Sequence, residues 1–244
     1  KRIIIINIFF MINLAGITKE LKNAQNKPQA SNLQRFFKTA KGQYGYGDVF
    51  LGIKVPVARE IAKKYVALDL KDVSDLLKNK IHEFRLAALL ILVEKYQKAK
   101  DRKTQEKIVK FYLNHTAYIN NWDLVDLSVY KILGAYLILE EGRMDVLDKL
   151  AKSKNLWERR MAMVATYAFI QKGRTEETLI IAKKLLKDEH DLMHKAVGWM
   201  LRELGKRVNR KTLTDFLDEN VKDMPRTALR YAIEHLEPKH REFY

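Results

Sequence analysis

Cysteine is absent from this chain of 244 residues. Without thiols, the protein forms no disulfide, holds no zinc through thiolates and has no cysteine nucleophile. The same absence fits a reducing compartment, and we therefore expect a cytoplasmic protein.

Proline is scarce, with four residues, and the alternation of apolar and polar residues that indicates strands is nearly absent. Apolar residues instead recur at spacings of 3 and 4 from Ile17 to Leu236, which predicts an all-helical fold. Pro56 and Pro225 are expected to open helices, and Pro238 to lie beyond the last one. The predicted helices are 17–25, 31–41, 56–68, 71–79, 82–99, 102–114, 122–140 with a break near Gly134, 143–153, 156–172, 175–187, 190–206, 209–220 and 224–236.

Long hydrophobic runs are missing, apart from Ile3–Phe10 behind Lys1 and Arg2. This segment imitates a signal peptide, but it is shorter than the ~18 apolar residues of a membrane span. We expect neither secretion nor membrane insertion. Two alternatives for residues 1–10 stay open: an extension upstream of Met11 or an apolar first helix.

Acidic residues are outnumbered by basic ones, 30 to 46, which gives a formal net charge of +16 and a pI near 9.7. Such an excess attracts polyanions through long-range steering and counterion release. A polyanion, either nucleic acid or an anionic membrane, is therefore the expected partner.

A helix opening recurs along the chain, and five equivalent positions are separated by intervals of 39, 36, 35 and 31 residues. These positions are Arg85, Leu124, Arg160, Lys195 and Arg226. The intervals are typical of HEAT-type helical pairs, so we expect residues 11–244 to form a single repeat domain, an α-solenoid with a concave basic groove. The basic residues of the set are expected to contact phosphates there, with ordinary solvated charges as the alternative.

Trp122 and Asp126 lie four residues apart, which places an indole and a carboxylate on one helical face. A carboxylate repels phosphate, so this pair suggests chemistry on a polyanion rather than affinity alone. Asp123 is the rival acid, but it lies about 100° around the helix from Trp122 and is expected to help open the helix. The alternative reading is a core tryptophan and an aspartate paired with a neighbouring arginine.

A second basic helix opening follows at Trp157-Glu158-Arg159-Arg160, where Arg160 is the preferred phosphate ligand, Arg159 is a further candidate and Trp157 is expected in the core. The alternative for Arg159 is a surface pair with Glu158. One repeat later, Lys195 and Trp199 repeat the spacing of four, and Arg202 with Glu203 is expected to form a surface pair.

Two further motifs are less specific. The glycine-rich stretch Gly42–Pro56 lacks the endings of nucleotide-binding loops, so we expect no nucleotide cofactor; Tyr44 and Tyr46 in it are candidate DNA contacts or turn residues. His190 and His194 have a metal-capable spacing, but no third ligand is evident, and we expect no metal.

Four strings occur in order across most of the chain: FLGIKVP, WDLVD, LWERRMA and KAVGWMLRE. In this combination the chain resembles the DNA alkylation repair family of HEAT-like alkylpurine DNA glycosylases. The resemblance implies a groove for duplex DNA, with Trp122 and Trp199 against the deoxyribose backbone and Asp126 as the catalytic carboxylate. Arg160 matches a basic residue near the site. Phe36 stands where such enzymes can have a tyrosine, which removes any hydroxyl role but keeps an apolar contact.

The chemistry of the expected substrate agrees with a single carboxylate. Alkylation at purine N3 or N7 makes the base cationic and a good leaving group, so no general acid is required. We therefore expect a monomeric, cofactor-free DNA glycosylase that acts on alkylated purines in double-stranded DNA and leaves an abasic site. A noncatalytic nucleic-acid-binding module and a scaffold for acidic peptides are the alternatives.

Overall fold

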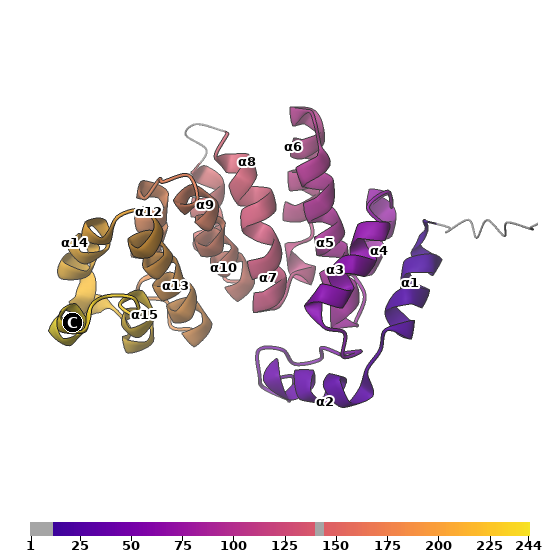
Figure 1. The fold of residues 1–244 in the computed structure, drawn as a ribbon, viewed down its shortest axis with the longest axis horizontal. Coiled ribbons are helices and arrows are strands. Elements are labelled where there is room, and N and C mark those ends of the chain that lie inside the picture. The colour runs from indigo at the N-terminus through magenta and orange to yellow at the C-terminus, as the bar shows by residue number, and fades with distance from the viewer. Residues whose placement is uncertain (1–11, 140–143) are drawn as a thin grey trace, which may run out of the picture. The chain divides into compact units, whose positions relative to one another are not determined.

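The computed structural model describes residues 12–139 and 144–244, and these are largely helical (Figure 1). Within these ranges, β structure is limited to an isolated bridge between Val49 and Ile81. The prediction of an all-helical fold is therefore confirmed, whereas residues 1–10 lie outside the described part. No helix in the described ranges is long and apolar enough to cross a membrane.

The chain comprises two compact units, residues 1–95 and 96–244. Unit 1 contains α1 (Leu14–Asn23), α2 (Lys27–Phe36), α3 (Val55–Lys64), α4 (Leu70–Leu77) and most of α5 (His82–Lys98). Unit 2 contains α6 (Arg102–Leu113), η1 (Thr116–Tyr118), α7 (Trp122–Val129), the π-helical turn η2 (Tyr130–Gly134), α8 (Ala135–Leu137), α9 (Asp145–Ala151), α10 (Leu156–Ala165), α11 (Tyr167–Ile170), α12 (Glu176–Leu185), α13 (Asp191–Arg207), α14 (Arg210–Asn220), η3 (Val221–Asp223), α15 (Arg226–Ala232) and α16 (Pro238–Phe243).

Short polar side chains determine where many of these helices begin. Asn13 Oδ1 accepts the Gly16 N–H at 2.8 Å, and Asn26 Oδ1 accepts the Gln29 N–H at 3.0 Å. Each bond satisfies a donor that the first helical turn leaves without a partner. As a result, α1 and α2 begin earlier than the apolar spacing predicts. The same type of cap precedes other helices at Asp69, Asp101, Asn121, Asn155 and Asn209.

Pro56 and Pro225 lie at the starts of α3 and α15, as predicted. The expected break near Gly134 takes the form of the π-helical turn η2, after which the helix continues as α8. Pro238 lies beyond the end of α15, as predicted, but it also opens α16, a further helix that was not predicted. Its fixed φ and missing N–H suit the first turn of a helix as well as a position beyond one.

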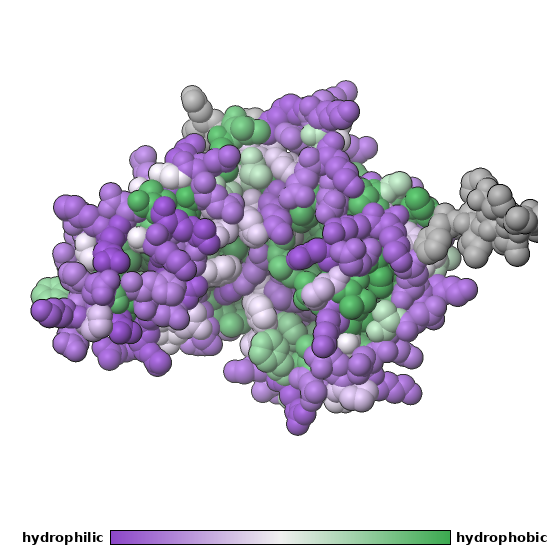
Figure 2. All heavy atoms as spheres, in the orientation of Figure 1, coloured by the Kyte–Doolittle hydropathy of each residue, from purple (hydrophilic) through white to green (hydrophobic). Residues whose placement is uncertain are grey.

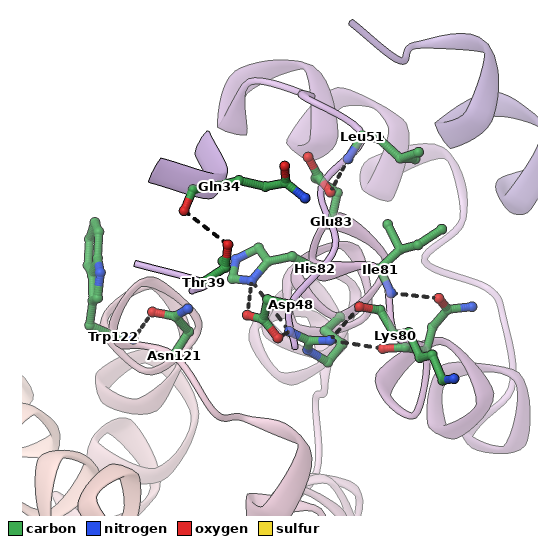
Figure 3. A network of polar contacts seen from close by, with 12 residues as sticks. Gln34, Thr39, Asp48, Leu51, Lys80, Ile81, His82, Glu83, Asn121 and Trp122 are labelled. Carbon is green, nitrogen blue, oxygen red and sulfur yellow. Dashed lines mark hydrogen bonds and ion pairs between the residues drawn. The ribbon is translucent and has the colours of Figure 1, made fainter. Parts of the chain in front are cut away.

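In unit 1, the glycine-rich loop is attached to α5 by one buried carboxylate. Glu83 is 1% exposed and accepts the backbone N–H groups of Leu51, Gly52 and Ile53 at 2.9, 2.7 and 3.1 Å. Figure 3 shows the Leu51 bond. Gly52 has φ +86, and a Cβ there would lie 2.1 Å from the Asn26 carbonyl oxygen, so only glycine fits.

A second buried network joins the same loop and helix. Asp48 Oδ1 accepts from Arg85 Nη2 at 2.6 Å, and Asp48 Oδ2 lies 3.1 Å from His82 Nδ1 (Figure 3). Arg85 also donates to the carbonyls of Asn79 and Lys80 at 2.9 and 3.2 Å. Its guanidinium thus stabilises the loop from within, in a side chain only 5% exposed.

The substitution Glu83→Gln should destabilise the protein by about 2 kcal/mol, because three backbone donors lose a charged acceptor and one then faces an amide NH₂. Urea denaturation measures this change. Glu60→Gln is the control, since its exposed pair with Lys63 contributes little. Equal midpoints for the two variants would contradict the proposed anchoring.

In unit 2, α7, α10, α13 and α15 pack in chain order, each against the next. In Figure 2, hydrophilic side chains cover most of the visible surface of α12–α15. The apolar side chains between the packed helices are buried, among them Leu124, Met161, Val164, Val197 and Met200.

Two glycines allow close approach between consecutive helices. A Cβ on Gly134 would lie 2.4 Å from the Ala165 carbonyl oxygen, and a Cβ on Gly198 would lie 2.3 Å from the Ala228 carbonyl oxygen. Backbone atoms cannot move aside as a side chain can. These positions therefore fix the spacing of η2 from α10 and α11, and of α13 from α15.

Gly198→Ala should destabilise the protein by about 1–3 kcal/mol through overpacking. The sign of the stability change distinguishes a packed position from an open one, because Gly→Ala at an open helix position stabilises the protein by up to about 1 kcal/mol. Thermal unfolding of the variant, beside Lys206→Ala on the exposed side of α13, measures the effect. A raised Tm for Gly198→Ala would refute the close packing.

Candidate active site

The site begins at the first turn of α7. Asn121 is fully buried, and its Oδ1 accepts the Trp122 N–H at 2.9 Å (Figure 3). This cap starts the helix at Trp122, whose side chain is partly exposed, and Asp126 follows one turn later on the same face. Asp123, the rival acid, is buried in the first turn of α7.

Asp126 forms a bidentate ion pair with Arg160 of α10. Arg160 Nε donates to Oδ1 at 2.9 Å and Nη2 donates to Oδ2 at 2.8 Å. The third contact of the guanidinium is Nη1 to the Leu192 carbonyl oxygen at 2.5 Å. One arginine therefore connects α7, α10 and α13 and fixes the orientation of the carboxylate.

Burial raises the pKa of Asp126 above its ordinary value, the charge and hydrogen bonds of Arg160 oppose this rise, and the nearby charge of Asp123 adds to it. The two side chains of the pair are only 15% and 6% exposed. A carboxylate with so little water around it exerts a strong local field, because the surrounding dielectric is low.

Half-exposed aromatic rings continue from this pair across unit 2. Tyr130 lies one turn beyond Asp126, and its ring centroid is 5.1 Å from that of Tyr167 in an edge-to-face arrangement. The Tyr167 ring centroid is 6.3 Å from that of Trp199, with the planes tilted by 31°. Trp199 is thus placed beside Tyr167, a residue that the sequence reading did not select.

Most of the predicted phosphate ligands form ion pairs with acidic side chains. Arg85 belongs to the buried Asp48 network of unit 1, which contradicts its predicted place in a groove. Arg160 is paired with Asp126 and is also buried, so its predicted role as a phosphate ligand is replaced by that of a carboxylate partner. Lys195 pairs with Asp191 at 2.7 Å but keeps 38% of its side chain exposed.

Arg159 forms a bidentate pair with Asp188, at 2.6 and 3.3 Å, and donates to the carbonyls of Ser153 and Lys154. The alternative, a surface pair with Glu158, is therefore not what the structure shows. Glu158 instead accepts the hydroxyls of Thr116 and Ser153 at 2.7 and 2.6 Å.

Trp157 lies in the core as predicted, 7% exposed. Arg202 pairs with Glu203 at 3.2 Å, but Glu203 is buried, so this is not the surface pair that was expected. His190 caps α13 by accepting the Leu192 N–H at 3.1 Å. His194 Nε2 lies 2.5 Å from the Asp188 carbonyl oxygen. In the described ranges, no cluster of His, Asp or Glu side chains could hold a metal ion.

The remaining candidates belong to unit 1. Phe36 ends α2 with 63% of its surface exposed, and its ring packs edge-on against Phe37 at 5.2 Å. Tyr46 is 66% exposed, and Tyr44 is half-buried. Exposed aromatic side chains on an anchored loop are available to a ligand, and their contact with DNA stays a prediction.

The sequence reading missed Tyr130 and Tyr167. A usable signal exists, because Trp122, Asp126 and Tyr130 repeat at four-residue intervals, and Tyr167 follows Arg160 by two helical turns. The buried carboxylate of Glu203, which accepts from Arg207 Nε at 2.6 Å, was also read as a surface group.

Comparison with known proteins identifies the family. The model of the DNA alkylation repair enzyme family matches residues 17–236, and the chain belongs to this family. Among solved structures, it is similar to a predicted DNA alkylation repair enzyme from Enterococcus faecalis, with a TM-score of 0.67 and 20% identity. That match covers 88% of this chain and 97% of the other, and it shows the fold. A search of curated proteins found no match.

A carboxyl ¹³C titration tests the site directly. The pKa of Asp126 should lie above its ordinary value of 3.8, and Arg160→Gln should raise it further, because the opposing positive charge is lost. Since the folded pKa is raised, the stability associated with the protonated form is present at low pH and is lost as pH rises through that pKa. Lys211→Gln, which removes an exposed pair with Asp215, should leave the titration unchanged. A wild-type pKa below 3.8 would show that the charge of Arg160, and not burial, dominates at Asp126.

Proposed function

We propose that the protein is a DNA glycosylase that hydrolyses the N-glycosidic bond of cationic N3- or N7-alkylated purines in duplex DNA, leaving an abasic site and using no cofactor. The observation that carries this proposal is the oriented, nearly dehydrated Asp126 carboxylate, with Trp122 one turn away. Family membership supports it, since the family is that of DNA alkylation repair enzymes.

The geometry suits stabilisation of a developing positive charge. The bidentate pair uses one lone pair on each Asp126 oxygen, and an ionised carboxylate has about four acceptor sites. The remaining lone pairs can face the oxocarbenium-like sugar or orient a water toward its anomeric carbon. Since the alkylated base leaves without a proton from the protein, a second carboxylate is not required.

Arg160 has two opposing effects on this chemistry. Its charge opposes the rise that burial causes in the pKa of Asp126 and so favours the ionised form, and its fork fixes the carboxylate plane. It also offsets part of the negative charge. The preorganised Asp126 carboxylate is expected to stabilise the transition state by about 3 kcal/mol, by analogy with single oxyanion-hole donors.

DNA binding in this proposal uses a concave groove of a HEAT-like solenoid, with α7, α10, α13 and α15 on its inner side. Trp122 and Trp199 contact the deoxyribose backbone of the damaged nucleotide. Because three of the arginines selected from sequence are paired with acids, the attraction for DNA rests on the excess of exposed basic side chains rather than on those three.

Asp126→Asn should lower the single-turnover release of 7-methylguanine from methylated duplex DNA by about 100-fold or more, because the carboxylate charge is lost while the shape is kept. Affinity for the duplex should stay equal or increase, since a charge that repels phosphate is removed. Freed bases are measured by mass spectrometry, and binding by fluorescence anisotropy.

Asp123→Asn is the matched control, because it removes a neighbouring acid of the same helix. Its rate of base release should stay within a few-fold of wild type. Unchanged release by Asp126→Asn would refute the catalytic assignment, and absence of release by the wild-type protein would leave the noncatalytic binding module as the better account.

A further inference from the structure

Three aromatic side chains of unit 2, Tyr130, Tyr167 and Trp199, form a row that we call the aromatic strip. The strip follows the same helical faces as the ion pair. Tyr130 lies four residues beyond Asp126, and Tyr167 lies seven beyond Arg160. Trp199 lies seven beyond Leu192, whose carbonyl accepts from Arg160. The strip is therefore a second row beside the one that contains the carboxylate.

The strip is presented to solvent rather than closed inside the core. Each of its side chains is partly exposed, and Tyr167 is the one residue between Met161 and Ile170 that is not buried. The ring centroids are 5.1 and 6.3 Å apart, so the rings support one another. Buried neighbours on both sides of Tyr167 hold its backbone in place.

A cation accompanies each of the two tyrosines. Lys131 Nζ lies 5.4 Å from the Tyr130 ring centroid, and Arg207 Cζ lies 5.5 Å from the Tyr167 ring centroid. Both distances are within the range of cation–π attraction. The strip thus combines apolar ring surface with positive charge along its length.

Glu203 fixes the arginine of this arrangement. Its carboxylate, 8% exposed, accepts from Arg207 Nε at 2.6 Å and from Arg202 Nη2 at 3.2 Å. Half of the Arg207 side chain, 47%, stays exposed. The buried acid is therefore neutralised by its two arginines, while the outer end of the Arg207 guanidinium is available to an anion.

We propose that the two tyrosines of the aromatic strip, with Lys131 and Arg207, bind the sugar–phosphate unit next to the nucleotide that Trp199 contacts and that reacts at Asp126. Deoxyribose packs against the rings, and its phosphate lies between the cations. In a duplex the bases are stacked inward, so sugar and phosphate are the parts that a row on a protein face can reach. This inference rests on the proposed function and assigns positioning roles to Tyr130, Tyr167 and Arg207.

Such a site acts by aligning the strand, so that the anomeric carbon of the damaged nucleotide faces the carboxylate. Ring area matters for this contact, whereas the phenol hydroxyl interacts with Arg207 rather than with the sugar. Tyr167→Phe should consequently behave like the wild type, whereas Tyr167→Ala should not. Arg207→Gln removes a phosphate contact and leaves the rings.

Fluorescence anisotropy with an undamaged labelled duplex measures the site without any chemistry. Tyr167→Ala should weaken binding about fivefold or more, and Tyr167→Phe less than twofold. Arg207→Gln should reduce the slope of log K against log salt by about 0.9, the value for one phosphate. The controls are Phe243→Ala, an exposed aromatic of α16, and Lys211→Gln. Circular dichroism establishes that each variant is folded. In Arg207→Gln, the buried Glu203 carboxylate keeps its contact with Arg202.

The outcomes separate this inference from the proposed function. Unchanged affinity and an unchanged salt slope in both Tyr167→Ala and Arg207→Gln would show that the aromatic strip does not bind DNA, even when the wild type releases 7-methylguanine. Weakened binding by both variants would support DNA binding by the strip, even when no base is released and the glycosylase proposal fails. In an active enzyme, Tyr167→Ala should raise KM by a larger factor than it lowers kcat, and rescue of both by Tyr167→Phe would exclude a role for the hydroxyl.

Discussion

The bidentate pair between Asp126 and Arg160 is the interaction on which the site depends. A carboxylate this deeply buried would take up a proton without a partner, and an isolated guanidinium would be equally costly to dehydrate. Paired, they connect α7 with α10, and the third guanidinium contact extends to α13 through the Leu192 carbonyl. The same bonds that hold three helices together therefore determine where the negative charge points.

Charge serves two separate purposes in this chain. The net excess of +16 provides long-range attraction for a polyanion. Individual arginines in the interior act differently, since Arg85, Arg159 and Arg160 each hold one aspartate and organise a loop or a helix end. Counting basic residues at repeat positions thus overestimates the number of phosphate ligands.

Much of the fold could be predicted from the sequence, because apolar spacing of 3 and 4 is a strong helical signal and most predicted helices coincide with real ones. The ends of the helices were predicted less accurately. For example, caps at Asn13 and Asn26 start α1 and α2 before the residues at which the apolar spacing begins. For the site, spacing alone placed Trp122 and Asp126 on one face. Their partners come from other helices, and no sequence pattern shows that Arg160 turns toward Asp126 or that Tyr167 stands beside Trp199.

In the proposed reaction, one oriented carboxylate is enough to hydrolyse the N-glycosidic bond, because the departing base is already positively charged. The most direct measurement compares single-turnover release of 7-methylguanine and of neutral hypoxanthine from otherwise identical duplexes. We expect release of 7-methylguanine and none of hypoxanthine above the rate without enzyme, because hypoxanthine is neutral and needs a general acid in order to leave. Comparable release of both bases would contradict the proposed single-carboxylate mechanism.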